Sequence, residues 1–309
     1  MFITPQLQQN LFGHEKIFDE LKSLYLKNKL PNKIILSGDK GIGKCTFAYH
    51  LINYILSKNE DYSYDIENYK INTKNKSFKL VLNKSNPNFN LIDVEDGKKN
   101  IDINQIRNLI STLNKSSFNS SPRFVLIDNI NLLNLNSVNA LLKVIEEPNY
   151  NINFILINSN TRVLPTLKSR CINFKIFLSK KEIIGIISKI IDNDIYDLFN
   201  EELINYYTTP GQIIKILEAS EEFKIDIKNL SLKNFLSLII KNKLYKKNKI
   251  LTELIYSFIE IYFRKNINIK NIELLNLYNF FLKKIINTKT YNLDEESLFI
   301  EFEDRILNG

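Results

Sequence analysis

The amino-acid sequence predicts an α/β protein in which a parallel sheet of the P-loop type is covered by helices and followed by two helical domains. Short runs rich in Val, Ile and Leu alternate with segments of helical periodicity, as is typical of parallel strands buried on both faces. Three of the eight glycines lie within residues 38–43, between one such run and a helix. No glycine occurs between Gly211 and Gly309 and no proline follows Pro210, which indicates helices joined by short turns.

The expected strands and helices alternate through residues 1–177, the first expected domain. A short helix opened by Pro165 comes before the last strand, and Asp102 with Gln105 forms a capping-box pattern at the start of a longer one. Pro148 ends another helix, because the residue before a proline disfavours the helical region. The strands are expected over residues 33–38, 90–94, 123–128, 153–158 and 172–176, and the helices over 14–29, 43–57, 102–115 and 137–147.

Residues 58–89 break this alternation. They are rich in Asn, Lys, Ser, Asp and Tyr, and they predict an irregular excursion with a weak strand over 78–82.

Helical periodicity continues in the second half of the chain. We expect a small helical domain over residues 178–228 and an all-α domain over 229–309. Its last two long helices are unusually rich in Phe, Tyr, Ile and Leu. Either an oligomer interface or a plain bundle core accounts for this wide apolar surface. The helices of the last domain are expected over residues 232–241, 249–265 and 271–287.

Composition excludes several classes of protein. No apolar run approaches the roughly 18–20 residues that span a bilayer, and residues 1–10 lack the features of a secretory signal, so a cytoplasmic protein is expected. Two cysteines are too few for a disulfide framework or a four-cysteine zinc site. The net charge of +8 permits contact with nucleic acid or an acidic partner, although the abundance of Asn, Ile and Lys weakens that signal.

The strongest local motif is SGDKGIGKCTF, residues 37–47. Gly38, Gly41 and Gly43 precede Lys44 between an expected strand and an expected helix. A phosphate cradle needs glycines because its backbone must curl with the N–H groups pointing inward. The helix dipole and the lysine ammonium then attract the phosphate oxygens. The motif predicts a phosphate-binding loop.

Two positions of this candidate site depart from an active ATPase. Cys45 stands where a Ser or Thr hydroxyl would bind Mg²⁺, and a thiol is a poor ligand for that hard ion. Thr46 is one residue late, about 100° further around the helix. Asp128 ends a strand where an aspartate supports the metal, but Asn129 follows it, and a neutral amide cannot act as a general base.

Three segments carry a resemblance to a known family. LPNKIILSGDKGIGKCT, VLIDNINLLNLNSVNALLKVIEEP and LPTLKSRC occur in this order. Together they resemble the bacterial clamp-loader subunits of the AAA+ superfamily, and most closely the delta prime branch of the DNA polymerase III family. The resemblance covers residues 11–175 at the level of motifs. The stretch 208–217 is similar to the second domain of that family, and the helical tail agrees with its collar domain in architecture only.

The resemblance implies roles for several residues. Arg170, in the Ser-Arg-Cys motif, would be an arginine finger that reaches the nucleotide site of a neighbouring subunit, whereas its sequence context alone favours a local salt bridge or helix cap. Asn158 stands at the sensor 1 position and would touch a γ-phosphate. The sensor 2 arginine is missing, with Gln212 and Lys215 near its place.

The resemblance also bears on metal and cofactor. Several family members carry a four-cysteine zinc module where this chain has residues 58–89 without a cysteine, so no zinc is expected. His14 and His50 support no predicted site, and His50 is expected to be structural. The altered loop is expected to bind ATP or ADP weakly or not at all.

These observations predict a clamp-loader subunit that has no ATPase activity of its own but is a component of the DNA-directed DNA polymerase holoenzyme. Its implied partners are other loader subunits, met through the collar and the Arg170 face, and the sliding clamp and primed DNA through the complex; no membrane partner is expected. An ATP-hydrolysing motor subunit is the main alternative. A small-molecule P-loop kinase is an alternative of another class, which the Ser-Arg-Cys motif and the helical tail disfavour.

Overall fold

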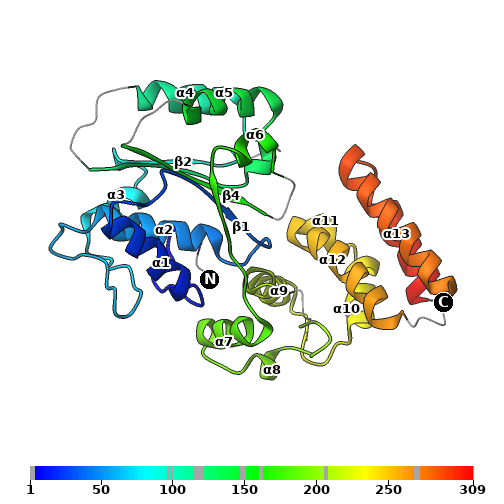
Figure 1. Ribbon diagram of the computed structural model, residues 1–309. Coiled ribbons are helices and arrows are strands. Elements are labelled where there is room, and N and C mark those ends of the chain that lie inside the picture. Colours follow the sequence, from blue (N-terminus) through cyan, green and yellow to red (C-terminus); the bar gives the residue numbers. More distant parts are fainter. Residues whose placement is uncertain are drawn as a thin grey trace. The chain divides into compact units, whose positions relative to one another are not determined.

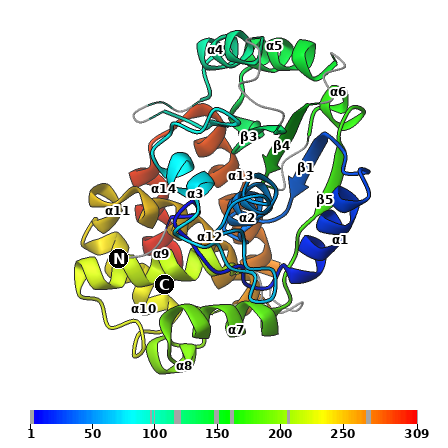
Figure 2. The same cartoon turned by 90° about the vertical axis from the view of Figure 1, so that its left-hand side faces the viewer.

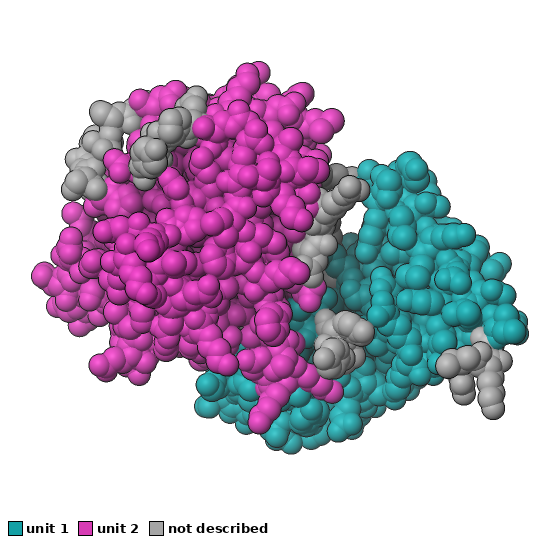
Figure 3. All heavy atoms as spheres, in the orientation of Figure 1, with its two compact units in different colours: residues 1–2, 184–309 teal, residues 3–183 magenta. Residues whose placement is uncertain are grey.

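The computed structural model describes residues 4–95, 98, 100–114, 121–146, 151–159, 163–204, 208–267 and 272–308 (Figure 1). The chain divides into two compact units, which are coloured separately in Figure 3. The N-terminal unit comprises residues 3–183, and the C-terminal unit comprises residues 184–309 together with residues 1–2. The expected boundaries at 177/178 and 228/229 stay predictions.

The N-terminal unit is built on a parallel sheet with the strand order β2-β3-β4-β1-β5. In register, Ser37 of β1 pairs with Asn158 of β4 on one side and with Lys175 of β5 on the other. The predicted parallel sheet is therefore confirmed. The strands are β1 (Lys33–Ser37), β2 (Phe89–Ile92), β3 (Arg123–Ile127), β4 (Ile152–Asn158) and β5 (Ile172–Lys175).

Helices cover both faces of this sheet, as Figures 1 and 2 show. The helices α1 (Glu15–Leu26), α2 (Lys44–Leu56) and α3 (Lys76–Leu82) lie on one face, and α4 (Ile103–Leu113) and α5 (Leu135–Glu146) lie on the other. Successive strand residues alternate between the faces: Leu36 and Leu126 pack under α1 and α2, whereas Ile35 and Val125 pack under α4 and α5. The short helices are η1 (Ile130–Leu132) and α6 (Pro165–Lys168).

Local sequence signals explain where several helices begin. The side chain of Asp102 accepts a hydrogen bond from the Asn104 N–H, and the Gln105 side chain accepts one from the Asp102 N–H, which confirms the predicted capping box of α4. Pro165 opens α6 as expected. The expected helix ends at 115 and 147, and Pro148, lie outside the described residues.

The excursion over residues 58–89 is folded against the N-terminal helices. The expected weak strand over 78–82 is wrong, because these residues belong to helix α3. Asn75 caps its start by accepting from the Phe78 N–H, and the Glu60 carboxylate accepts hydrogen bonds from the N–H groups of Lys76 and Ser77. The free N–H groups of the first turn are thus satisfied by residues that local apolar pattern does not reveal.

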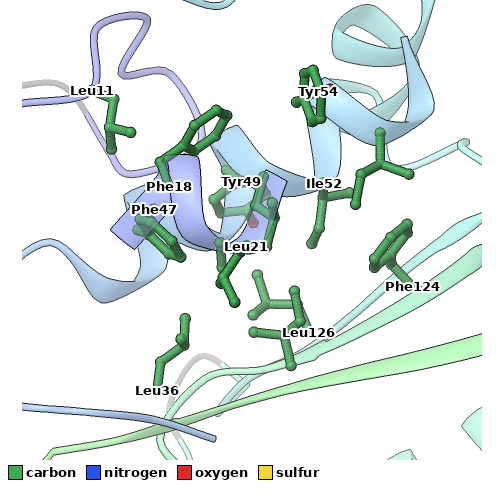
Figure 4. Packing of buried hydrophobic residues seen from close by; sticks show 14 of the residues in the cluster. Leu11, Phe18, Leu21, Leu36, Phe47, Tyr49, Ile52, Tyr54, Phe124 and Leu126 are labelled. Atoms are coloured by element: carbon green, nitrogen blue, oxygen red, sulfur yellow. The ribbon is translucent and has the colours of Figure 1, made fainter. Parts of the chain in front are cut away.

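Phe18 of α1 anchors the excursion through an aromatic cluster. Its fully buried ring lies 5.3–6.3 Å, centroid to centroid, from the rings of Phe47, Tyr54, Tyr64 and Tyr69. Phe47 and Tyr54 belong to α2, and the other two tyrosines belong to the excursion. Figure 4 shows Phe18, Phe47 and Tyr54 within the core above Leu36 and Leu126.

The C-terminal unit is helical in the part of the chain that the structure describes, as predicted. Its Phe235, Phe258, Phe281, Phe299 and Phe302 rings are fully buried. None of the described helices is both long enough and apolar enough to cross a membrane. The elements are α7 (Lys180–Ile191, which crosses the division between the units), α8 (Ile195–Leu198), α9 (Pro210–Phe223), α10 (Leu232–Lys241), α11 (Leu244–Lys247), α12 (Lys249–Asn266), α13 (Ile272–Tyr291), α14 (Glu295–Phe302) and the π-helical turn η2 (Glu303–Leu307).

Candidate phosphate site and the Arg170 surface

The glycine loop joins the end of β1 to the start of α2, as predicted. Gly41 and Gly43 have φ angles of 86° and 99°, positive values that residues with a Cβ rarely adopt. Gly38 is required for another reason, because a Cβ there would lie 2.3 Å from the backbone oxygen of Ile176. The backbone therefore curls immediately before the first turn of α2, where a helix has free N–H groups, and this arrangement suits the binding of a phosphate.

Lys44 is buried inside the loop. Its Nζ donates hydrogen bonds to the backbone oxygens of Gly38, at 2.8 Å, and Asp39, at 2.7 Å. Burial lowers the pKa of Lys44 to about 8, against the opposing effect of the Asp128 and Asp39 carboxylates. The ammonium group therefore binds the loop's own carbonyls, and these contacts would have to exchange for phosphate oxygens.

Cys45 and Asp128 contact each other. The Cys45 thiol lies beside the carboxylate of Asp128, which directly follows β3. Burial, together with this nearby negative charge, raises the pKa of Cys45 well above its usual value, so the sulfur carries its proton at neutral pH. Burial also raises the pKa of Asp128, and the charge of Asp93 adds to that effect. The two predicted metal-site positions are thus brought together, and one of them holds a protonated thiol.

Asp93 is a residue of this site that the sequence interpretation missed. It directly follows β2, and the pairing of Ile92 with Ile127 places it beside Asp128 at the same end of the sheet. The sequence shows that Asp93 follows an apolar strand. It does not show that this strand, β2, lies beside β3 and so brings Asp93 close to Asp128. Within the described residues, no group of three or more His, Cys, Asp or Glu side chains could hold a metal ion.

Three further predicted residues border the loop. Thr46 lies on α2, half-buried, one position after Cys45. Asn158 ends β4, is buried, and accepts a hydrogen bond from the Gly38 N–H at 3.2 Å through its backbone oxygen. Asn129 follows Asp128 with φ 59° and ψ 63°, a left-handed conformation that asparagine tolerates better than most residues. The loop, Asp128 and Asn158 therefore lie at one end of the sheet.

Gln212 and Lys215 belong to the C-terminal unit. The Gln212 side chain accepts a hydrogen bond from the Thr209 N–H at 2.9 Å and so caps α9. Lys215 lies 4.0 Å from the carboxylate of Glu253 on α12.

The two histidines are both buried. His14 lies beneath the loop: its Nε2–H donates to the Ile42 carbonyl at 2.7 Å, and a Cβ at Gly43 would lie 3.2 Å from that nitrogen. The sequence interpretation gave His14 no place in the site, because its contact is 28 positions away in sequence. His50 donates through Nε2 to the Gln8 carbonyl and accepts through Nδ1 from the Tyr64 hydroxyl, a structural role as expected.

The buried His50 predicts an acid-sensitive fold. Burial lowers the pKa of His50 to about 4 from 6.5, so between these values the unfolded chain binds a proton that the folded chain does not. The resulting stability is complete above pH 6.5 and is lost as the pH falls to about 4, by roughly 3 kcal/mol. Urea unfolding at several pH values should show that the free energy of unfolding falls less in acid for His50→Gln than for the wild-type protein. An equal loss in both proteins would contradict the prediction.

Arg170 lies at the other end of the sheet from the loop. It precedes β5, whose first residue Ile172 pairs with Ile34, whereas the loop follows Ser37 at the far end of β1. Four residues of strand place the two about 13 Å apart along the sheet. Arg170 therefore lies at a distance from the loop of its own chain.

The Arg170 side chain makes three local contacts. Its Nη1 donates to the Thr166 carbonyl, at 2.9 Å, and to the Ser169 hydroxyl, at 3.2 Å. Its Nη2 lies 2.8 Å from a carboxylate oxygen of Glu146, the last residue of α5. About a third of the Arg170 side chain is exposed. The local salt bridge that its sequence context favours is thus present, at the surface.

A glycine loop between an inner strand of a parallel sheet and a helix, with an aspartate at the end of another strand, defines an α/β P-loop protein of the AAA+ type. The family described as "DNA polymerase III, delta subunit" matches residues 13–179, more than half of the chain. The chain belongs to this family, as its motifs predicted.

Named relatives agree with this assignment. DNA polymerase III subunit delta' of Buchnera aphidicola subsp. Baizongia pistaciae is 32% identical over 161 residues, which are 50% of this chain and 46% of the relative. The delta' subunit of Pseudomonas aeruginosa is 29% identical over 45% of this chain and 40% of its own. A gamma subunit of Buchnera aphidicola subsp. Acyrthosiphon pisum is 27% identical over 63% of this chain and 53% of its own length. The chain spans about half the length of these relatives.

Two solved structures show more distant likeness. A DNA polymerase III gamma subunit-related protein of Thermotoga maritima is 19% identical, with a TM-score of 0.44 over 92% of this chain and 97% of its own. The RuvB Holliday junction branch migration motor of the same organism is 18% identical, with a TM-score of 0.42 over 78% of this chain and 81% of its own.

Proposed function

We propose that this chain is a delta-prime-type subunit of the DNA polymerase III clamp loader that does not hydrolyse ATP and that supplies Arg170 to the nucleotide site of a neighbouring subunit. The observation that carries this proposal is the chemistry at the start of α2, where Cys45 places a protonated thiol beside the Asp128 carboxylate. A thiol thus stands where a hydroxyl would bind Mg²⁺.

Loss of hydrolysis follows from the chemistry of three residues. A protonated thiol is a poor ligand for Mg²⁺, so Asp128 would have to support the metal without help from Cys45. Asn129, next to it, cannot take a proton from water. Lys44 and the glycine backbone retain the groups that bind phosphate, so ATP or ADP would bind weakly and without help from Mg²⁺. No zinc is proposed.

Replacing Cys45 with serine tests this account of the metal. In Cys45→Ser we expect Mg²⁺ to strengthen ATP binding by about ten-fold, equivalent to 1.4 kcal/mol, because a hydroxyl is a hard ligand. In the wild-type chain Mg²⁺ should change the affinity little. Cys171→Ser is the matched control, since Cys171 is buried in the core on the other face of the sheet. Calorimetric titration measures the effect, and equal Mg²⁺ dependence in all three proteins would contradict it.

The position of Arg170 supports action on a neighbour. Its guanidinium lies at the end of the sheet opposite the loop and is partly exposed, so it is accessible to another subunit. A guanidinium keeps its charge at any physiological pH, and its planar fork matches phosphate oxygens. Supplied from outside a nucleotide site, such a group stabilises the charge of phosphoryl transfer.

The C-terminal unit carries apolar surface that suits the predicted collar. Isolated exposed apolar residues are ordinary on a protein surface, but α13 and the segments beside it expose several large ones. Packing against other subunits would cover them. These residues are Ile272, Leu275, Phe280, Ile286, Tyr291, Leu293 and Ile300.

The positive charge of the chain resides in the N-terminal unit. Residues 3–183 contain 25 Lys and Arg against 16 Asp and Glu, whereas residues 184–309 contain 17 against 18. If DNA is contacted within the loader, the N-terminal unit is the part that carries the required charge. That contact would weaken as salt rises.

The motor subunit is the second candidate function. A gamma subunit relative matches 77% of this chain, a larger share than either delta' relative matches, and Lys44 is present. Such a subunit would hydrolyse ATP in spite of Cys45 and Asn129.

Two measurements test the proposed function. Co-purification with candidate loader subunits, read by mass, should give a stoichiometric complex, and its absence would remove the proposal. ATP turnover should then be measured for the chain alone and for the complex with sliding clamp and primed DNA. We expect Lys44→Ala in this chain to leave turnover unchanged; turnover that is lost in this variant would identify the motor subunit instead.

A further inference from the structure

Glu146 forms an ion pair with Arg170. It is the last residue of α5, and its carboxylate lies 2.8 Å from Nη2 of Arg170, which follows α6. The two residues are 24 positions apart in sequence, so this pairing depends on the packing of the two helices and not on local spacing. Among the described residues, Arg170 is the only ion-pair partner of Glu146.

The location of Glu146 makes its negative charge unusual. The C-terminal end of a helix carries a partial negative charge, so a carboxylate there is unfavourable unless a cation compensates it. Arg170 is that cation. Both side chains remain partly exposed, with 37% of the arginine and 52% of the glutamate accessible, so solvent and salt weaken the pair. The contact is therefore strong enough to orient Arg170 and weak enough to exchange.

Exchange is required if Arg170 is to bind a phosphate through both arms of its fork. A two-armed contact uses parallel N–H donors of the guanidinium, and in this structure Nη2 is directed at Glu146 while Nη1 is directed at Thr166 and Ser169. A phosphoryl oxygen that approaches from a neighbouring site would compete with the Glu146 carboxylate for the same donors.

We propose that Glu146 is a positioning residue that holds Arg170 until the phosphate of a neighbouring subunit's nucleotide displaces it, an inference that rests on the proposed function of Arg170. This ion pair, called the tether below, keeps Arg170 oriented in the free chain and lowers the fraction of molecules in which the guanidinium is free to bind a phosphate. An exposed ion pair shifts such an equilibrium by about two- to five-fold. The tether therefore sets a modest, salt-sensitive limit on turnover in the complex.

A double-mutant cycle in the assembled complex tests the inference. At low salt, Glu146→Gln should raise ATP turnover by about two- to five-fold, and the increase should shrink as salt is added, because salt screens the pair. In the Arg170→Ala background the same glutamine substitution should change nothing. Glu146→Asp, which keeps the carboxylate, should stay close to wild type. A fall in turnover, no rise, or the same rise without Arg170 would overturn the inference.

A measurement on the free chain separates this inference from the proposed function. The NMR signal of the Arg170 side chain should show greater motion in Glu146→Gln than in the wild-type protein. Equal motion in the two proteins would overturn the tether, whatever Arg170 does in the complex. If Arg170→Ala leaves turnover by the complex unchanged, the proposed function itself fails.

Discussion

Replacing Arg170 with alanine is expected to lower ATP turnover by the assembled complex by about 10³-fold, the lower end of what an arginine finger contributes. This chain alone should show no turnover before or after the change. The physical reason is the loss of the fixed positive charge that the proposed function places at the phosphoryl group of a neighbour. Steady-state hydrolysis by the complex, with clamp and primed DNA present, measures the effect.

The control must separate catalysis from folding. Arg170→Ala removes a partly exposed ion pair, so its free energy of unfolding should change by no more than about 1 kcal/mol. Lys168→Ala removes an exposed positive charge two residues earlier and should leave turnover near the wild-type rate. Turnover by the complex that is insensitive to Arg170→Ala, or equally sensitive to Lys168→Ala, would show that Arg170 is not a finger.

Local pattern predicted most of the N-terminal unit. The strands were recognisable because parallel strands buried on both faces must be continuously apolar, as residues 123–127 are. The start of α4 was recognisable because a capping box needs only Asp102 and Gln105. The glycine loop could be placed because its three glycines are required by backbone conformation and close approach. In each case the signal in the sequence lies within a few consecutive residues.

The features that sequence reasoning missed depend on contacts between distant segments. Residues 78–82 form a short, largely apolar run that suggested a weak strand, but the carboxylate of Glu60 satisfies the first turn of a helix there. Asp93 joins the site only because β2 lies beside β3. Glu146 meets Arg170 only because α5 and α6 pack on the same side of the sheet. No local periodicity carries this information.

Replacing Phe18 with alanine is expected to destabilise the N-terminal unit by about 3–5 kcal/mol, the usual range for removing a buried phenylalanine. The ring holds α1 to α2 and to the excursion through Phe47 and Tyr64, so the cavity would lie where three segments meet. The loss should be measured by urea unfolding, monitored by circular dichroism.

The matched control is Phe177→Ala, since this phenylalanine belongs to the same unit but is 79% exposed; it should change stability by less than about 0.5 kcal/mol. Hydrogen exchange then locates the damage. In Phe18→Ala the amides of residues 57–75, of which Tyr64 and Tyr69 pack on the lost ring, should exchange faster than those of β3. Uniform acceleration across the unit would mean that the cluster supports the whole core and does not specifically anchor the excursion.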